Sequence, residues 1–171
     1  MHPLRFYPII LCLSFLLLKG QAQTTDTTAI MPGPPVAHSP FKTITLERVS
    51  ANGHKDSGVV DVVFTANNQS VQIASLIFSI NPALSKAADD QDSIYPISQL
   101  RLGANKKDPD NNVITVELRP DQALHCGLYL AHVPLTARYI RKVVLFTSLR
   151  LDDAPQGEDN IILTNLEIRW K

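Results

Sequence analysis

The stretch GVVDVVFTA (residues 58–66) decides the fold class that this sequence predicts. Val60, Val62 and Phe64 occupy every second position, and a charged residue, Asp61, stands between the first two. Side chains on a β-strand alternate between its two faces, whereas a helix would need apolar residues every three or four positions. The stretch therefore predicts a strand with one buried face and one solvated face.

Similar short runs recur over most of the chain. They lie at residues 42–50, 70–80, 95–102, 114–118, 126–133, 143–151 and 166–170. The run 143–151 is apolar at both parities, so we expect it to be covered on both faces or to lie at a dimer contact. Turn-rich segments separate the runs, at Asn52-Gly53, 67–69, 108–112 and 152–160, and residues 83–90 have room for one helical turn. The pattern predicts an all-β, immunoglobulin-like antiparallel β-sandwich of about seven to eight strands.

The first 40 residues differ from the rest. Residues 1–22 combine Arg5, an apolar run of about ten residues and the small residues of Gly20-Gln21-Ala22, which predicts a secretory signal peptide. The apolar run is too short to span a bilayer, so a membrane-spanning segment is not expected after cleavage. Residues 23–40 are rich in Thr and Pro and predict a flexible, extended linker. The β-sandwich domain is then expected over residues 41–171.

Charge and cysteine content limit the function classes. The chain has 16 basic and 16 acidic residues, and loss of Arg5 and Lys19 with the signal peptide changes its net charge from zero to −2. A nucleic-acid partner would require an excess of clustered Lys and Arg, so none is expected. Cys126 is the only cysteine left after cleavage, so an internal disulfide is excluded.

Catalytic chemistry is not expected. His125 neighbours Cys126 in a predicted strand and therefore points to the opposite face. His132 shares the parity of Cys126 but lies about 20 Å further along an extended strand. Neither histidine can act as the paired base of a thiol nucleophile, and no hydrolase, zinc-protease or nucleotide-binding motif occurs. We expect no cofactor, with Ca²⁺ as the one possible exception.

The acidic loop DPDNN (residues 108–112) is the candidate metal site. Asp108, Asp110 and Asn112 alternate, so three oxygen ligands could converge on one Ca²⁺ ion. The loop lacks the Gly and Glu of an EF-hand, since Val113 and Arg119 occupy those positions. The alternative is a solvated turn without metal.

The segments ITLERVSANG (44–53), VVDVVFTANNQ (59–69), YIRKVVLFTSL (139–149) and NLEIRW (165–170) carry a family resemblance. In this arrangement the sequence resembles small exported immunoglobulin-like β-sandwich proteins of Bacteroidetes-type bacteria. Most of these have no known function, so the resemblance implies an exported sandwich and no catalytic residues. It also draws attention to Asp-Ser/Thr motifs at Thr27 and Ser93, which fit the acceptor pattern for O-glycans in such bacteria.

These observations together predict an exported, non-catalytic structural or protein-interaction module of the cell envelope. The expected location is the periplasm or the cell surface. Val144, Phe146 and Leu149 form the candidate interaction surface. Binding of a partner would bury this apolar face or add a strand to a sheet edge. The expected partner is an envelope protein, a glycan or a second copy of the chain. A glycan- or calcium-binding module is the alternative function.

Overall fold

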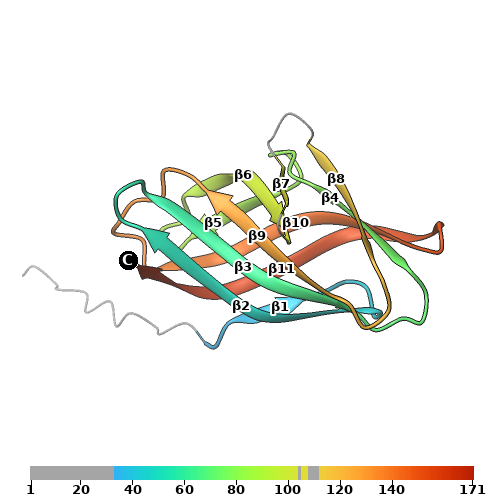
Figure 1. The fold of residues 1–171 in the computed structure, drawn as a ribbon. Helices are drawn as coiled ribbons and strands as arrows, with labels where there is room; N and C mark the ends of the chain where they lie inside the picture. Colours follow the sequence, from blue (N-terminus) through green and yellow to red (C-terminus); the bar gives the residue numbers. More distant parts are fainter. Residues whose placement is uncertain (1–32, 104, 108–111) are drawn as a thin grey trace, which may run out of the picture. The chain divides into compact units, whose positions relative to one another are not determined.

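The structure is a computed structural model that describes residues 33–103, 105–107 and 112–171. This part of the chain forms eleven strands and no helix (Figure 1). The strands are β1 (Val36–His38), β2 (Ile44–His54), β3 (Val59–Asn68), β4 (Ala74–Ser79), β5 (Lys86–Asp89), β6 (Ile94–Leu102), β7 (Asn105–Lys107), β8 (Val113–Leu118), β9 (Ala123–Leu130), β10 (Tyr139–Leu151) and β11 (Ala154–Trp170). The predicted signal peptide, residues 1–22, lies outside the described residues.

The strands form two sheets that pack face to face. The first sheet has the order β1-β11-β10-β4-β8, with β5 beside the first half of β10. The second sheet has the order β2-β3-β9-β6, with β7 beside the end of β6. All of these pairings are antiparallel, and the one parallel pairing joins the end of β11 to β2. The all-β, immunoglobulin-like architecture predicted from the sequence is confirmed.

Two strands belong to both sheets and connect them. β6 pairs with β5 up to Pro96 and with β9 from Ile97 onward. β11 pairs with β10 up to Glu167 and with β2 from Ile168 onward. Just before this change of partner, Asn165 adopts a positive φ of 60°, a backbone conformation that asparagine tolerates better than most residues. A local irregularity of this kind lets a strand bend from one layer into the other.

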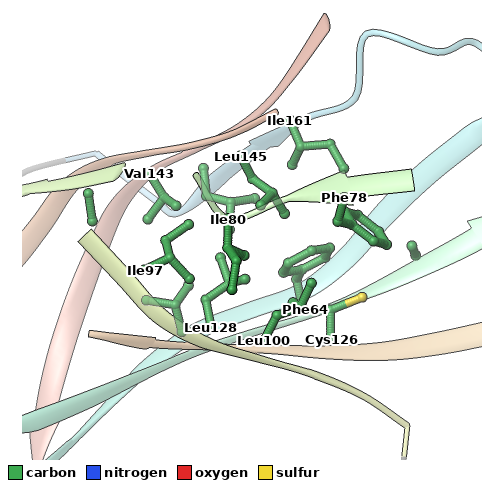
Figure 2. Close-up of a cluster of buried hydrophobic side chains, with 14 of the residues drawn as sticks. Phe64, Phe78, Ile80, Ile97, Leu100, Cys126, Leu128, Val143, Leu145 and Ile161 are labelled. Carbon is green, nitrogen blue, oxygen red and sulfur yellow. The ribbon is translucent and has the colours of Figure 1, made fainter. Parts of the chain in front are cut away.

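The core lies between the inner faces of the two sheets (Figure 2). Phe64 and Leu128 enter it from the second sheet, and Phe78, Leu145 and Ile161 enter it from the first. Each of these side chains is at most 2% exposed. Burial of a side chain of this size contributes roughly 2 kcal/mol, so the alternating apolar positions are the main source of stability.

The structure corrects two turn predictions. Asn52 and Gly53 lie inside β2, and the turn follows at residues 55–58. Gly53 is opposite Trp170, whose ring occupies the space where a side chain would be, so the glycine is explained by a close approach and not by a turn. The segment 152–160 is a turn only at Asp152 and Asp153, both with positive φ, which form a two-residue hairpin turn between β10 and β11.

Three strands had no counterpart in the sequence prediction. Residues 86–89, placed in a possible helical turn, form β5 and pair with β10 and β6. β1 lies within the range 23–40 predicted as a linker, where Val36 pairs with Thr164 of β11. β7 is a three-residue strand at the end of β6. Strands this short depend on pairing with a neighbour and carry little periodicity of their own.

Candidate functional site

The outer face of the first sheet carries two of the three residues predicted as an interaction surface. Val144 and Phe146 lie there and are half-buried. Leu149 has the opposite parity, is 2% exposed and packs in the core. The three residues therefore do not share a surface, because an odd spacing along a strand moves a side chain to the other face of the sheet.

Two further residues join Val144 and Phe146 on this face. Val144 is directly opposite Ile162 of β11. Phe146 is opposite Ser79 of β4, which places Ile77 diagonally beside it. Direct and diagonal cross-strand neighbours are close enough for their side chains to touch. We call Ile77, Val144, Phe146 and Ile162 the apolar stripe, and all four are half-buried.

The apolar stripe runs toward a sheet edge. Val113, at the start of β8, is opposite Ser79 and 56% exposed. β8 pairs with β4 on one side, and no described strand pairs with its other side. A free strand edge presents backbone N–H and C=O groups that an added strand can use. The stripe and this edge therefore form one continuous candidate contact surface.

The outer face of the second sheet is chemically different, because it holds a groove of about 320 Å³ whose lining includes two arginines and a histidine. The lining side chains on this face come from four adjacent strands or their ends: Arg48, Val63, Thr65, Arg101 and His125, together with Gly127. Gly127 of β9 is opposite Val63 on one side and Arg101 on the other. Because Gly127 has no side chain, the Arg101 side chain can pack over it, with Nε 3.7 Å from where a Cβ would be.

A β-bulge brings Arg48 to the groove. β2 holds one extra residue between Glu47 and Ser50 relative to β3, and Arg48 there has a positive φ of 54°. Bulges redirect side chains and occur frequently near functional sites, and a non-glycine residue with positive φ is conformationally costly. The bulge therefore brings the Arg48 side chain to the groove although the backbone conformation at Arg48 is unfavourable.

Arg101 is held over an aromatic ring. Its guanidinium carbon lies 5.3 Å from the centroid of the Tyr129 ring, within the range of a cation–π contact. The groove also contains a hydrogen bond of 3.1 Å between Thr65 Oγ1 and His125 Nδ1. Among the described residues, neither Arg48 nor Arg101 forms an ion pair with a carboxylate.

Cys126 does not offer its thiol to the groove. The side chain is 2% exposed and lies in the core, opposite Phe64 in the neighbouring strand (Figure 2). Burial raises the pKa of the thiol to about 12, so the nucleophilic thiolate is disfavoured. His125 occupies the outer face of the same strand, as the alternation of side chains predicts.

The predicted calcium loop lies largely outside the described residues, which include only Asn112 of its three proposed ligands. The backbone carbonyl of Asn112 accepts a hydrogen bond from Ile80 N–H, and its side chain is exposed. Within the described part of the chain, no three His, Cys, Asp or Glu side chains are grouped so that they could hold a metal. The calcium site stays a prediction.

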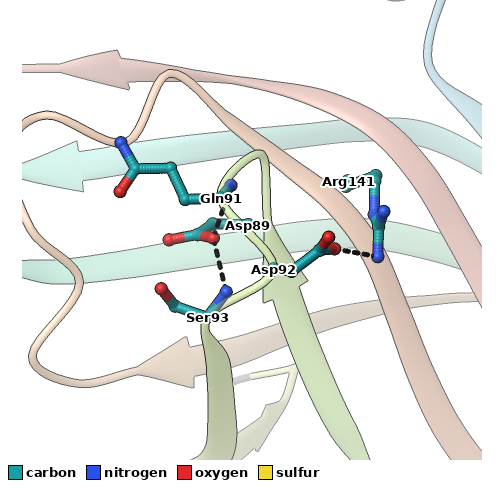
Figure 3. A network of polar contacts seen from close by, with 5 residues as sticks. All are labelled: Asp89, Gln91, Asp92, Ser93 and Arg141. Carbon is teal, nitrogen blue, oxygen red and sulfur yellow. Dashed lines mark hydrogen bonds and ion pairs between the residues drawn. The ribbon is translucent and has the colours of Figure 1, made fainter.

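Of the two predicted glycosylation sites, Thr27 lies outside the described residues and Ser93 lies in the exposed turn between β5 and β6 (Figure 3). The turn is organised around Asp89, which is fully buried and accepts hydrogen bonds from Gln91 N–H and Ser93 N–H. The Tyr95 hydroxyl donates a third, of 2.7 Å. Glycosylation at Ser93 is compatible with this exposure and stays a prediction.

No protein-family model matches this chain, and no curated protein matches it at significant similarity. Solved structures give distant matches. AggA, the major subunit of aggregative adherence fimbriae type I of Escherichia coli, is 9% identical with a TM-score of 0.43, and the match covers 82% of this chain and 97% of AggA. A PapD-like domain of human CEP192 is 8% identical with a TM-score of 0.37, covering 78% of this chain and 87% of that domain. The periplasmic chaperone SfaE is 9% identical with a TM-score of 0.30, covering 75% and 57% of the two chains.

These matches amount to a distant similarity to immunoglobulin-like fimbrial subunits and PapD-like domains. At such TM-scores and identities they carry no argument about what this chain binds. They also give no support for a particular bacterial group, so the resemblance to Bacteroidetes-type proteins stays a prediction. Within the described residues, no helix is long and apolar enough to cross a membrane.

Sequence reasoning missed both arginines of the groove. Arg48 and Arg101 are 53 positions apart and stand as isolated basic residues in their strands. They line one groove only because β3 and β9 lie between β2 and β6 in the sheet. The one available sequence signal was Gly127 inside a predicted strand, since a glycine there frequently marks a place where another group approaches the backbone.

Proposed function

We propose that this chain is an exported, non-catalytic interaction module of the cell envelope that binds a protein partner through the apolar stripe. Export rests on the predicted signal peptide at residues 1–22. The observation that supports binding is the continuity of Ile77, Val144, Phe146 and Ile162 across three adjacent strands of the outer face. Isolated apolar side chains are common on protein surfaces, whereas contiguous groups of them are typical of contact sites.

A partner would bury the side chains of the apolar stripe on binding. These side chains are already partly ordered in the free protein. Phe146 lies near its centre, between β4 and β11. Large aromatic side chains at the centre of an interface supply a large share of the binding energy, while their neighbours mainly exclude water. The open edge of β8 offers a second element of contact, because a partner strand could hydrogen-bond to its free backbone groups.

The experiment is site-specific photo-crosslinking in the cells that make the protein. A photoreactive amino acid replaces Phe146 in one variant and Leu135 in a control variant. Leu135 is 55% exposed in the loop before β10, away from the stripe. We expect a discrete crosslinked partner from position 146 and none from position 135. The partner is then identified by mass spectrometry and purified for a binding measurement.

Binding of the purified partner is compared for the native chain, Phe146→Thr and Leu135→Thr. Threonine keeps a strand-compatible side chain at both positions. We expect Phe146→Thr to weaken binding at least about tenfold and Leu135→Thr to leave it unchanged. Light scattering on the purified chain identifies the case in which the partner is a second copy. Equal crosslinking from both positions, or a partner whose affinity does not respond to Phe146→Thr, would refute the proposal.

A further inference from the structure

The groove on the outer face of the second sheet has a one-sided charge distribution. Arg48 and Arg101 line it, and among the described residues no carboxylate does. Two acidic residues do lie on the same face: Glu47, opposite Thr65, and Asp61, opposite Tyr129. Asp61 Oδ2 lies 3.3 Å from His54 Nε2, whereas Asp61 Oδ1 is buried and has no hydrogen-bond partner among the described residues. The described lining of the groove therefore carries two positive charges, and the two carboxylates of this face stand outside that lining.

Arg101 is held against its neighbours and does not lie free in solvent. Its guanidinium lies over the Tyr129 ring, and its Nε would be 3.7 Å from a Cβ at Gly127, which is ordinary packing distance. An arginine fixed on an aromatic face keeps its planar set of N–H donors in one orientation. Less conformational freedom is then lost when the donors bind two oxygens of one anion.

The other polar groups of the groove are also suited to an anion. His125 is bonded to Thr65 through Nδ1, and its Nε2 has no hydrogen-bond partner among the described residues. Gly127 has no side chain, so the Arg101 side chain packs directly over the backbone there, beside these groups. A volume of about 320 Å³ is at the small end of the range for ligand pockets, which suits a group of roughly monosaccharide size.

We propose that this groove binds the oxyanion group, a carboxylate, sulfate or phosphate, of a ligand of about monosaccharide size. Arg101 and Arg48 supply the positive charge, and the groove that they line accepts the ligand. These three anions share the oxygen acceptors that a guanidinium recognises, so the structure selects the class and not the source. This site is on the opposite sheet from the apolar stripe, so it is independent of the proposed protein contact.

The test is isothermal titration calorimetry of the full domain with four probes: inorganic sulfate, inorganic phosphate, glucuronate and uncharged glucose. We expect saturable binding of at least one anionic probe, with a dissociation constant of about 1 mM or tighter, and none of glucose. Binding of sulfate or phosphate alone would indicate a free inorganic anion. Stronger binding of glucuronate would indicate an acidic sugar. Absence of binding by all three anions, or equal binding of glucose and glucuronate, would overturn the proposal.

Variants locate the binding. Arg101→Gln should weaken anion binding at least about tenfold, because it removes a charged hydrogen-bond donor. Gly127→Val should do the same, because its methyl groups would enter the groove and displace the Arg101 side chain, whose Nε lies 3.7 Å from a Cβ at this position. Arg150→Gln is the matched control, since Arg150 is an exposed arginine of β10 in the other sheet. Unfolding curves verify that each variant is folded. Equal loss of binding in Arg101→Gln and Arg150→Gln would mean non-specific attraction and would also overturn the proposal.

Discussion

Replacement of Asn68 by alanine should destabilise this domain more than the loss of so small a side chain would suggest. Asn68 ends β3, and its side chain is fully buried. Its amide nitrogen donates hydrogen bonds of 2.8 Å to Gln72 O and 2.9 Å to Leu118 O. Its amide oxygen accepts one of 2.9 Å from Ser70 N–H. One side chain thus joins the β3–β4 turn to the end of the edge strand β8.

The expected loss follows from where the three partners lie. Ser70 and Gln72 are near solvent, so their backbone groups can bind water, and each lost bond costs about 1 kcal/mol. Leu118 is fully buried, but it is directly opposite Ala74 in the antiparallel β4–β8 ladder, so its carbonyl keeps a backbone partner and this lost bond also costs about 1 kcal/mol. The sum is about 3 kcal/mol, which corresponds to a fall in Tm of roughly 10 °C for a domain of this size.

Urea unfolding at equilibrium measures this loss, and Asn67→Ala is the matched control. Asn67 is half-buried and makes no side-chain hydrogen bond within the described residues, so we expect its change to stay below about 0.5 kcal/mol. Asn68→Asp should be at least as damaging as Asn68→Ala at neutral pH, because a carboxylate oxygen would face two carbonyl oxygens. A loss below about 1 kcal/mol for Asn68→Ala, or equal losses for both alanine variants, would refute this account of the turn.

Two further predictions concern the close approach of Trp170 to Gly53 and the buried thiol of Cys126. Gly53→Ala should cost roughly 2 kcal/mol and shift the fluorescence of Trp170, the only tryptophan, because the new Cβ would lie 2.6 Å from Trp170 Cδ2. Gly33→Ala is the control for this variant, since a Cβ there meets only Asn165 Nδ2 at 3.7 Å. An unchanged emission spectrum in Gly53→Ala would contradict the close approach of Trp170. Cys126 should resist maleimide in the folded domain at pH 8 and react at once in denaturant. Since burial raises its pKa from 9.0 to about 12, its contribution to the free energy of unfolding is complete below pH 9 and decreases as the pH rises toward 12. Native alkylation as fast as that of the unfolded chain, or a Cys126→Ala variant with the same alkaline loss of stability, would show that reasoning to be wrong.

The fold was largely predictable because burial imposes a period of two. Phe64 and its neighbours in β3 alternate between buried and more exposed positions as their sequence indicates. The failures occur where a residue has a role that its type does not reveal. Gly53 in an Asn-Gly pair looks like a turn, and only the approach of Trp170 from the far end of the chain explains why it continues a strand.

The length of β11 was underestimated for a different reason. Its first residues, from 154 to 159, are exposed and include no large apolar side chain, so they lack the apolar alternation that identifies a strand. They are held by antiparallel pairing with β10, which backbone hydrogen bonds supply whatever the side chains are. The two positive-φ aspartates of the turn, Asp152 and Asp153, fix the register of this hairpin.

The candidate sites were less predictable because they depend on which strands become neighbours. Val144 and Phe146 could be recognised within one strand, whereas Ile77 and Ile162 join them through pairings with β4 and β11. The groove depends in the same way on the order of β2, β3, β9 and β6. Strand order in a sandwich is set by the whole chain, so residues far apart in sequence meet without any local pattern.

The two outer faces of this domain carry different residues, and this contrast distinguishes the requirements of function from those of folding. Folding requires apolar side chains on the inner faces, and residues such as Phe64 and Leu145 satisfy that need. It places no such requirement on the outer faces, where polar residues serve equally well and keep the chain soluble. Phe146 beside Val144 and diagonal to Ile77 and Ile162 on one face, and Arg101 over Tyr129 on the other, are therefore features that the core does not require. The proposed binding of a partner on one side and of an anion on the other would account for both.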